Sequence, residues 1–178
     1  ENAVAASAIA LTYGLDPEKI RKALATFAGV KRRFDIQLET EKCVYIDDYA
    51  HHPREITASL TSIKGNFPGY RLTAIFQPHL YTRTRDFADG FAEALSNADR
   101  LILLDIYPAR EEPIPGVTSE IIFRNITTED KVLLKKEELM EHLKGMELSD
   151  KEVFVTVGAG DIDRFIGPIR ELLKKHID

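Results

Sequence analysis

The chain opens with apolar positions at helical spacing and changes, after about 30 residues, to short apolar runs between polar loops. Alanine-rich residues 1–11 predict a helix that ends before Gly14, a residue free to take a left-handed backbone conformation. Residues 16–18, Asp-Pro-Glu, are typical of a second helix start: an acceptor at the N-cap, proline in the first turn and negative charge at the positive end of the helix dipole. Gly29 is expected to end that helix.

From residue 34 onward, short strands alternate with amphipathic helices. Two runs around the polar turn 40–42 predict a hairpin of residues 34–39 and 43–47. Further strands are expected at 72–76, 101–106, 131–134 and 153–157. Helices are expected at 53–64, 86–95, 118–123 (capped by Thr118 or Ser119) and 137–143, with a last one from 161 that is interrupted at Gly167-Pro168. This alternation indicates an α/β fold: a mostly parallel sheet with helices on both faces and an antiparallel hairpin at its start. The predicted domains are 1–31 and 32–178.

Composition narrows the functional classes without naming a chemistry. The 178 residues carry 24 Lys and Arg against 29 Asp and Glu, a net charge of −5, which argues against a nucleic-acid partner held by a basic face. No apolar run reaches the roughly 18 residues of a membrane-spanning helix, so no membrane partner is expected. The single cysteine, Cys43, cannot form an internal disulfide, which favours a reducing, cytoplasmic location.

The loops that follow the predicted strands carry the candidate chemistry. In open parallel sheets, ligands bind outside the carboxyl ends of the strands. Those ends are followed here by 47–53 (DDYAHHP), 77–86 (QPHLYTRTRD), 107–116 (YPAREEPIPG) and 158–161 (GAGD). We expect these four loops, which contain three of the five histidines, to meet on one rim.

Each polar group in these loops has two interpretations. Asp47 and Asp48 could cap a turn or the helix that starts at Pro53, or one of them could bind a ribose hydroxyl or a cation. Arg83 and Arg85, near a predicted helix start, could be solvated or form a fork for a carboxylate or phosphate. The adjacent histidines of the first loop point apart and lack HExxH spacing, so we expect no metal site.

The remaining motifs are weak. Gly158-x-Gly160 before a helix lacks the third glycine of a dinucleotide fingerprint, so a tight turn is the default interpretation. No GxxxxGK[ST] phosphate loop is present, and the segment is therefore not expected to activate a triphosphate by itself. No serine lies in a nucleophile elbow and Cys43 falls in a predicted strand, so covalent catalysis is unsupported and no catalytic residue is assigned.

Four blocks, in this order, resemble the C-terminal domain of the Mur ligase family: DDYAHHPREI (47–56), FQPHLYTRTRDF (76–87), DIYPAREEPIPG (105–116) and VGAGDI (157–162). The first two blocks are similar to those of its alanine-adding members. The resemblance implies that 32–178 is the Rossmann-like, amino-acid-binding domain. It also implies that 1–31 comprises the last helices of a central ATPase domain and a linker.

The resemblance further implies a reaction and its partners. Alanine-adding Mur ligases use ATP and Mg²⁺ to phosphorylate the carboxylate of UDP-N-acetylmuramate, and L-alanine attacks the acyl phosphate during peptidoglycan synthesis. ATP and Mg²⁺ would bind mainly outside this segment, which we expect to be inactive alone. The alternatives are a ligase that joins a ready-made tripeptide to the same sugar in cell-wall recycling, a non-catalytic nucleotide- or amino-acid-binding module, and, last, a metal-dependent hydrolase using His51, His52 and His79.

Site residues follow from the matching positions. The family's nucleotide-contacting positions correspond here to Asn2, Arg33 and Asp48. Its amino-acid-contacting positions correspond to Tyr49, His51, His79 and Arg83, with Arg83 as the fork for the substrate carboxylate. The family often has arginine directly after the QPH sequence, where this chain has Leu80, so the fork falls to Arg83 alone or is shared with Arg85.

Overall fold

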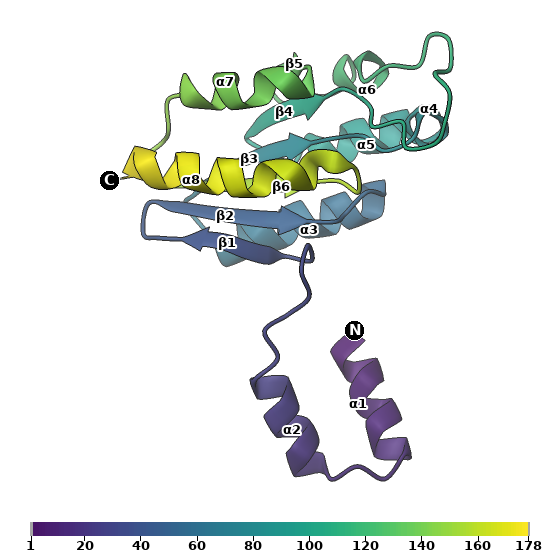
Figure 1. Cartoon of the computed structure of the whole chain (residues 1–178), viewed down its shortest axis with the longest axis vertical. Coiled ribbons are helices and arrows are strands. Elements are labelled where there is room, and N and C mark those ends of the chain that lie inside the picture. Colours follow the sequence, from purple (N-terminus) through teal and green to yellow (C-terminus); the bar gives the residue numbers. More distant parts are fainter. Residues whose placement is uncertain (1, 178) are drawn as a thin grey trace. The chain divides into compact units, whose positions relative to one another are not determined.

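The computed structural model describes residues 2–177, so the predictions for Glu1 and Asp178 concern residues outside the described part of the chain. The chain divides into two compact units between Val30 and Lys31 (Figure 1). We call the first the helix pair and the second the sheet unit, and each is described by itself. Among residues 2–177, no helix combines the length and the apolar character needed to cross a membrane.

The helix pair consists of α1 (Asn2–Thr12) and α2 (Pro17–Ala25). Gly14 has a positive φ of 75° after α1, as its place at the helix end predicts. The carboxylate of Asp16 accepts a hydrogen bond from the backbone N–H of Glu18 (2.9 Å), which confirms the predicted N-cap.

The sheet unit is built on one six-stranded sheet, which confirms the predicted fold class. Its strands are β1 (Asp35–Glu39), β2 (Cys43–Asp48), β3 (Arg71–Phe76), β4 (Arg100–Leu104), β5 (Asp130–Leu134) and β6 (Glu152–Val157). They lie in the order β1-β2-β6-β3-β4-β5 (Figure 1). Strands β1 and β2 pair antiparallel, and every other pairing is parallel.

Helices cover both faces of this sheet because its strands are apolar on both sides. Along β6, Val153, Val155 and Val157 pack in one buried cluster while Phe154 packs in the other. The first cluster includes side chains of α3 (Pro53–Asn66), α5 (Ala88–Leu95) and α6 (Glu120–Phe123). The second includes side chains of α7 (Leu139–Lys144), α8 (Ile166–Ile177) and the 3₁₀ turn η2 (Asp161–Phe165). A shorter 3₁₀ turn, η1 (Lys136–Glu138), leads into α7.

The structure corrects several helix predictions. The segment expected to be loop before residue 86 forms a helix, α4 (Tyr81–Asp86), separated from α5 by Phe87. The expected interruption at Gly167-Pro168 is wrong, because both residues lie in the first turn of α8, where proline removes no intrahelical hydrogen bond.

One expectation about a helix cap is also wrong. The hydroxyl of Ser119 donates to the backbone oxygen of Leu104 (2.6 Å) and does not cap α6. The predicted strand position of Cys43 is confirmed, since it is the first residue of β2 and is buried. Burial and the nearby charge of Glu152 raise the pKa of its thiol to about 12. A thiol held in that state is a poor nucleophile at neutral pH.

Candidate functional site

The carboxyl ends of the parallel strands meet at one edge of the sheet, and hydrogen bonds join the loops that follow them. Gly158 donates to the backbone oxygen of Asp48 (3.2 Å), which links the loops after β6 and β2. Leu80 donates to the oxygen of Tyr107 (2.9 Å), and Tyr107 donates to that of Pro78 (2.8 Å), which links the loops after β3 and β4. This edge is the rim expected from the sequence.

The glycines of the loop after β6 allow neighbouring loops to pack closely against it. A Cβ on Gly158, whose φ is 140°, would lie 2.7 Å from the backbone oxygen of Gln77. A Cβ on Gly160 would lie 2.5 Å from the side-chain oxygen of Gln77 and 2.8 Å from the Cβ of Tyr107. That side-chain oxygen of Gln77 accepts the N–H of Ile162 (3.0 Å), and its amide donates to Asp161 (2.9 Å). The close approach of neighbouring loops therefore accounts for both glycines.

Asp48 is half-buried and fixed by its own loop. One oxygen accepts the N–H of Ala50 (3.1 Å) and the other accepts the hydroxyl of Ser59 on α3 (2.7 Å). Asp48 therefore makes a local turn and does not cap α3. With Arg33 it lines a shallow pocket of about 310 Å³, so the structure brings these two sequence-predicted residues together.

The cap of α3 is supplied by the histidine loop. His52 occupies the N-cap and its ring accepts from the N–H of Arg54 (3.4 Å), while Glu55 accepts the N–H groups of His51 (3.0 Å) and His52 (3.2 Å). Burial acts against ionisation of Glu55, but the N–H bond from His51 and the charge of that residue outweigh it and lower its pKa. His52 is therefore a helix cap.

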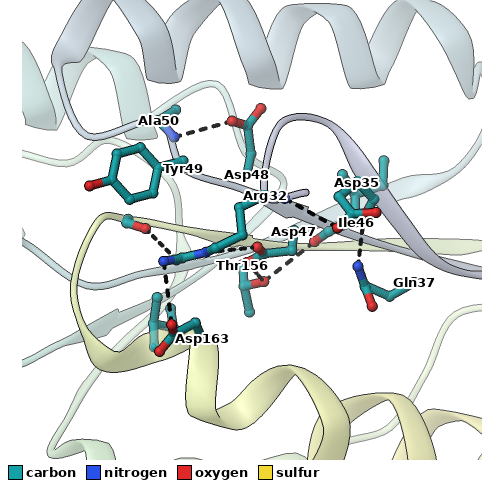
Figure 2. A network of polar contacts seen from close by, with 12 residues as sticks. Arg32, Asp35, Gln37, Ile46, Asp47, Asp48, Tyr49, Ala50, Thr156 and Asp163 are labelled. Carbon is teal, nitrogen blue, oxygen red and sulfur yellow. Dashed lines mark hydrogen bonds and ion pairs between the residues drawn. The ribbon is translucent and has the colours of Figure 1, made fainter. Parts of the chain in front are cut away.

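Arg32, which the sequence did not single out, joins three segments of the rim. Its Nε lies 3.1 Å from Asp47, one Nη donates to the oxygen of Gly158 (2.8 Å), and the other lies 3.6 Å from Asp163 (Figure 2). Asp47 is fully buried and also accepts the hydroxyl of Thr156 (2.7 Å). Burial raises the pKa of Asp47, against the bonds from Thr156 and Arg32. The only hint of this contact in the sequence was the pair of adjacent arginines, Arg32 and Arg33.

Tyr49 and His51 lie together beside these arginines. Their rings meet edge to face with centroids 5.2 Å apart, and the Nδ1 of His51 lies 3.0 Å from the backbone oxygen of Tyr49 and 3.4 Å from Glu55. The guanidinium groups of Arg32 and Arg33 lie 5.1 and 5.8 Å from the centre of the Tyr49 ring. Tyr49 is thus in contact with the arginine of the Asp48 pocket.

His79 and Arg83 form the second pair of predicted residues. His79 stacks on Tyr107 (centroids 5.7 Å apart), and its Nδ1 lies 3.5 Å from a terminal nitrogen of Arg83. Burial lowers the pKa of His79, and the positive charges of Arg83 and His51 lower it further, against the charge of Glu111. A neutral His79 can accept a hydrogen bond from Arg83 or from a ligand.

The two arginines of α4 differ in their partners. Both lie in the last turn of α4, shortly before α5 begins, and not in the loop that the sequence predicted there. Arg85 is more than half exposed and pairs with Asp86 (2.8 Å). Arg83 is half-buried, and no carboxylate among residues 2–177 lies within salt-bridge distance of it. The carboxylate of Glu111, in the loop after β4, accepts the N–H of Thr82 (3.0 Å).

Not every predicted residue joins the rim. Asn2 belongs to the helix pair, where it begins α1 and lines a groove between the two helices. Within residues 2–177, no three His, Cys, Asp or Glu side chains are grouped so that they could hold a metal ion. A pocket of about 430 Å³ between the ends of β4 and β5 contains none of the predicted residues; Asp105, Lys135 and Glu138 are part of its lining.

The sheet order and the rim of polar loops define an α/β domain of the open, ligand-binding kind. Residues 32–160 match the family described as Mur ligase, glutamate ligase domain, and the chain therefore belongs to the Mur ligase family. It is 56% identical over 177 residues to a UDP-N-acetylmuramate--L-alanine ligase of Parabacteroides distasonis, and this match covers 99% of the chain and 38% of that relative. The chain thus spans little more than a third of that relative's length.

Two solved structures resemble the whole chain. A UDP-N-acetylmuramate-alanine ligase from Thermotoga maritima superposes with a TM-score of 0.79 at 30% identity, over 98% of this chain and 37% of that one. A murein peptide ligase from Psychrobacter arcticus gives 0.65 at 25% identity, over 97% of this chain and 35% of that one.

Proposed function

We propose that this chain is the amino-acid-binding C-terminal part of a cytoplasmic, ATP-dependent ligase. The ligase joins L-alanine to UDP-N-acetylmuramate through an acyl phosphate in peptidoglycan synthesis. The name and identity of the Parabacteroides distasonis relative support the reaction. In this proposal residues 1–31 are the end of a central ATPase domain and its linker, and the sheet unit binds the amino acid.

The observation that carries the proposal is the Arg83 guanidinium, which has no carboxylate within salt-bridge distance among the described residues 2–177. A half-buried guanidinium without a carboxylate partner is a site for a ligand carboxylate, because its parallel N–H groups match both oxygens. In our proposal Arg83 binds the carboxylate of L-alanine, while Tyr49, His51 and His79 surround the amino acid. Neutral His79 orients Arg83 through the 3.5 Å contact between their nitrogens.

The nucleotide is assigned to the Asp48 pocket. Arg33 is exposed and has no carboxylate within salt-bridge distance among residues 2–177, so it suits a phosphate or ribose oxygen. Asp48 has a lone pair left on each oxygen after its two hydrogen bonds and suits ribose hydroxyl groups. Asn2 is proposed to bind near the adenine. Among residues 2–177 no three His, Cys, Asp or Glu side chains are grouped to hold a metal ion, so we place none of the Mg²⁺ ligands among these residues.

The test is phosphate release by the full-length ligase that carries this chain, supplied with ATP, Mg²⁺ and UDP-N-acetylmuramate, with and without L-alanine. The matched variants are Arg83→Ala and Arg85→Ala, two arginines of one helix with different partners. We expect Arg83→Ala to lower kcat/KM for alanine about 10- to 100-fold, since a charge-assisted bond contributes roughly 1.5–3 kcal/mol. Arg85→Ala is expected to change it less than twofold.

Three outcomes would change or contradict the proposal. If kcat/KM for alanine fell in Arg85→Ala and not in Arg83→Ala, Arg85 would be the residue that binds the substrate carboxylate. Release that requires a tripeptide in place of alanine would favour the recycling ligase, a possibility supported by the likeness to the murein peptide ligase. Absence of release with either acceptor would contradict the proposed reaction.

A further inference from the structure

Arg32 and Arg33 are neighbours in the chain but have opposite environments. The Arg32 side chain is 21% exposed and contacts Asp47, Gly158 and Asp163, as seen in Figure 2. Arg33 is exposed and lines the pocket that contains Asp48. The two side chains thus leave the same turn toward different parts of the rim.

The backbone of residues 32–34 is strained and tightly held. Arg32 and Phe34 have positive φ values of 60° and 49°, which a side chain with a Cβ rarely adopts. The N–H of Arg32 donates to the carboxylate of Asp35 (3.1 Å), and the oxygen of Arg32 accepts the N–H of Tyr49 (2.6 Å). Such strain persists where the surrounding contacts impose it, and it is frequent at functional sites.

These contacts extend directly to the proposed nucleotide site. Arg32 fixes the backbone of Tyr49 through its carbonyl and packs its guanidinium on the Tyr49 ring, 5.1 Å from the centre. Arg33 lies against the same ring at 5.8 Å. Gly158 accepts a hydrogen bond from the Arg32 guanidinium through its backbone oxygen and donates its N–H to the backbone oxygen of Asp48. Arg32 thus touches the supports of both Arg33 and Asp48.

We propose that Arg32 is a positioning residue for nucleotide binding: by anchoring the turn 31–34 on Asp47 and Gly158, it holds the Arg33 guanidinium beside Asp48 and Tyr49. This inference rests on the proposed function, because it assigns Arg33 and Asp48 to the nucleotide. Arg32 itself acts through Arg33. A lysine at position 32 would keep the positive charge next to buried Asp47 but could not bridge its three partners at once.

The experiment compares Arg32→Lys, Arg33→Ala and the double variant in the full-length ligase. Each is assayed for kcat, for KM of ATP and of L-alanine, and for binding of a fluorescent ATP analogue. We expect Arg32→Lys to raise the KM for ATP and the analogue Kd about tenfold and to leave the KM for alanine within twofold. Because Arg32 works through Arg33, the double variant is expected to bind no more weakly than Arg33→Ala alone.

The control is Arg124→Lys, an exposed arginine that donates to the oxygen of Glu120 on α6, and it is expected to leave all constants unchanged. If Arg32→Lys does not fold, Asp35→Ala loosens the same turn without touching the Arg32 guanidinium. It is expected to weaken nucleotide binding about threefold.

The results separate this inference from the proposed function. The inference would be overturned if the effects of Arg32→Lys and Arg33→Ala on the analogue Kd multiplied in the double variant. It would also be overturned if Arg32→Lys lowered the melting temperature but left nucleotide binding unchanged. A wild-type protein that binds the ATP analogue but releases no alanine-dependent phosphate would contradict the proposed function. In that case weaker analogue binding by Arg32→Lys would still support the positioning role.

Discussion

The helix pair and the sheet unit differ in how far their apolar side chains are buried. No side chain of α1 or α2 is buried, and Val4, Ile9 and Phe27 are 73%, 60% and 64% exposed. Together the two helices line an apolar groove of about 630 Å³. In the sheet unit, by contrast, Phe154 and Tyr45 are fully buried, and none of the buried side-chain nitrogen and oxygen atoms described lacks a hydrogen-bond partner.

The difference shows where each unit obtains its stability. A helix that is apolar on every side, like α1, is typical of one that other protein covers, since exposed apolar surface is unfavourable in water. The sheet unit supplies its own cover from helices on both faces. We therefore expect matched substitutions to have large effects in the sheet unit and small ones in the helix pair.

The largest contrast is expected between two phenylalanines. Phe154→Ala removes a fully buried side chain and should lower the free energy of unfolding by about 3–5 kcal/mol. Phe27→Ala removes an exposed side chain and should change it by less than about 0.5 kcal/mol. Urea unfolding of the 178-residue chain, followed by circular dichroism, measures both. Equal losses would show that the helix pair is buried in solution.

Alanine substitutions at two glycines of the sheet unit should change its stability in opposite directions. Gly160→Ala places a Cβ against Gln77 and Tyr107 and should cost about 1–3 kcal/mol of stability through overpacking. Gly65→Ala in α3 meets no atom within 4 Å and should stabilise by about 0.4–1 kcal/mol, because it restricts the unfolded chain. The same urea midpoints provide the readout, and a neutral Gly160→Ala would contradict the close approach of these loops.

The helix pair can be perturbed separately. Asp16→Ala removes the carboxylate that accepts the N–H of Glu18 and should destabilise α2 by about 1 kcal/mol. We expect a smaller far-UV helix signal at 222 nm with no shift in the urea midpoint of the sheet unit. A matched loss in that midpoint would show that the two units unfold together.

The smallest effect concerns the titration of His79. Burial and the charge of Arg83 place its pKa below 6.5, so Arg83→Gln should raise that pKa, as proton NMR of the imidazole would record. Because the folded pKa is the lower one, the unfolded chain binds more protons between the two values. His79 thus contributes stability above pH 6.5 that is lost as the pH falls through its folded pKa. An unchanged pKa in Arg83→Gln would contradict their contact.

Much of the sheet unit was predictable because its strands are apolar on both faces. All six strands were expected within two residues of their observed ends. Helix α4 was missed because its sequence, YTRTRD, has no apolar periodicity. It is held instead by contacts such as those of Thr84 with the oxygen of Leu80 (2.8 Å) and of Thr82 with Glu111 (3.0 Å).

Among the site residues, residue type and loop position were readable, but partners were not. The resemblance named Arg83 as the fork, alone or shared with Arg85, without showing what either contacts; in the structure Arg85 pairs with Asp86, whereas Arg83 contacts His79. The sequence also drew attention to Arg33 and not to Arg32. Arg32 finds Gly158 126 positions along the chain, a distance at which local patterns carry no information about contact.

The sequence by itself determined the alternation of strands and helices, the helix ends at Gly14 and Asp16, and the set of polar loops at the strand ends. These features depend on hydrogen bonds and side-chain periodicity within a few residues. Only the tertiary structure decided the strand order β1-β2-β6-β3-β4-β5, the burial of Asp47 beneath Arg32 and the close packing of Gly160 on Gln77. Each of these joins segments far apart in the chain, and packing of the complete core selects among them.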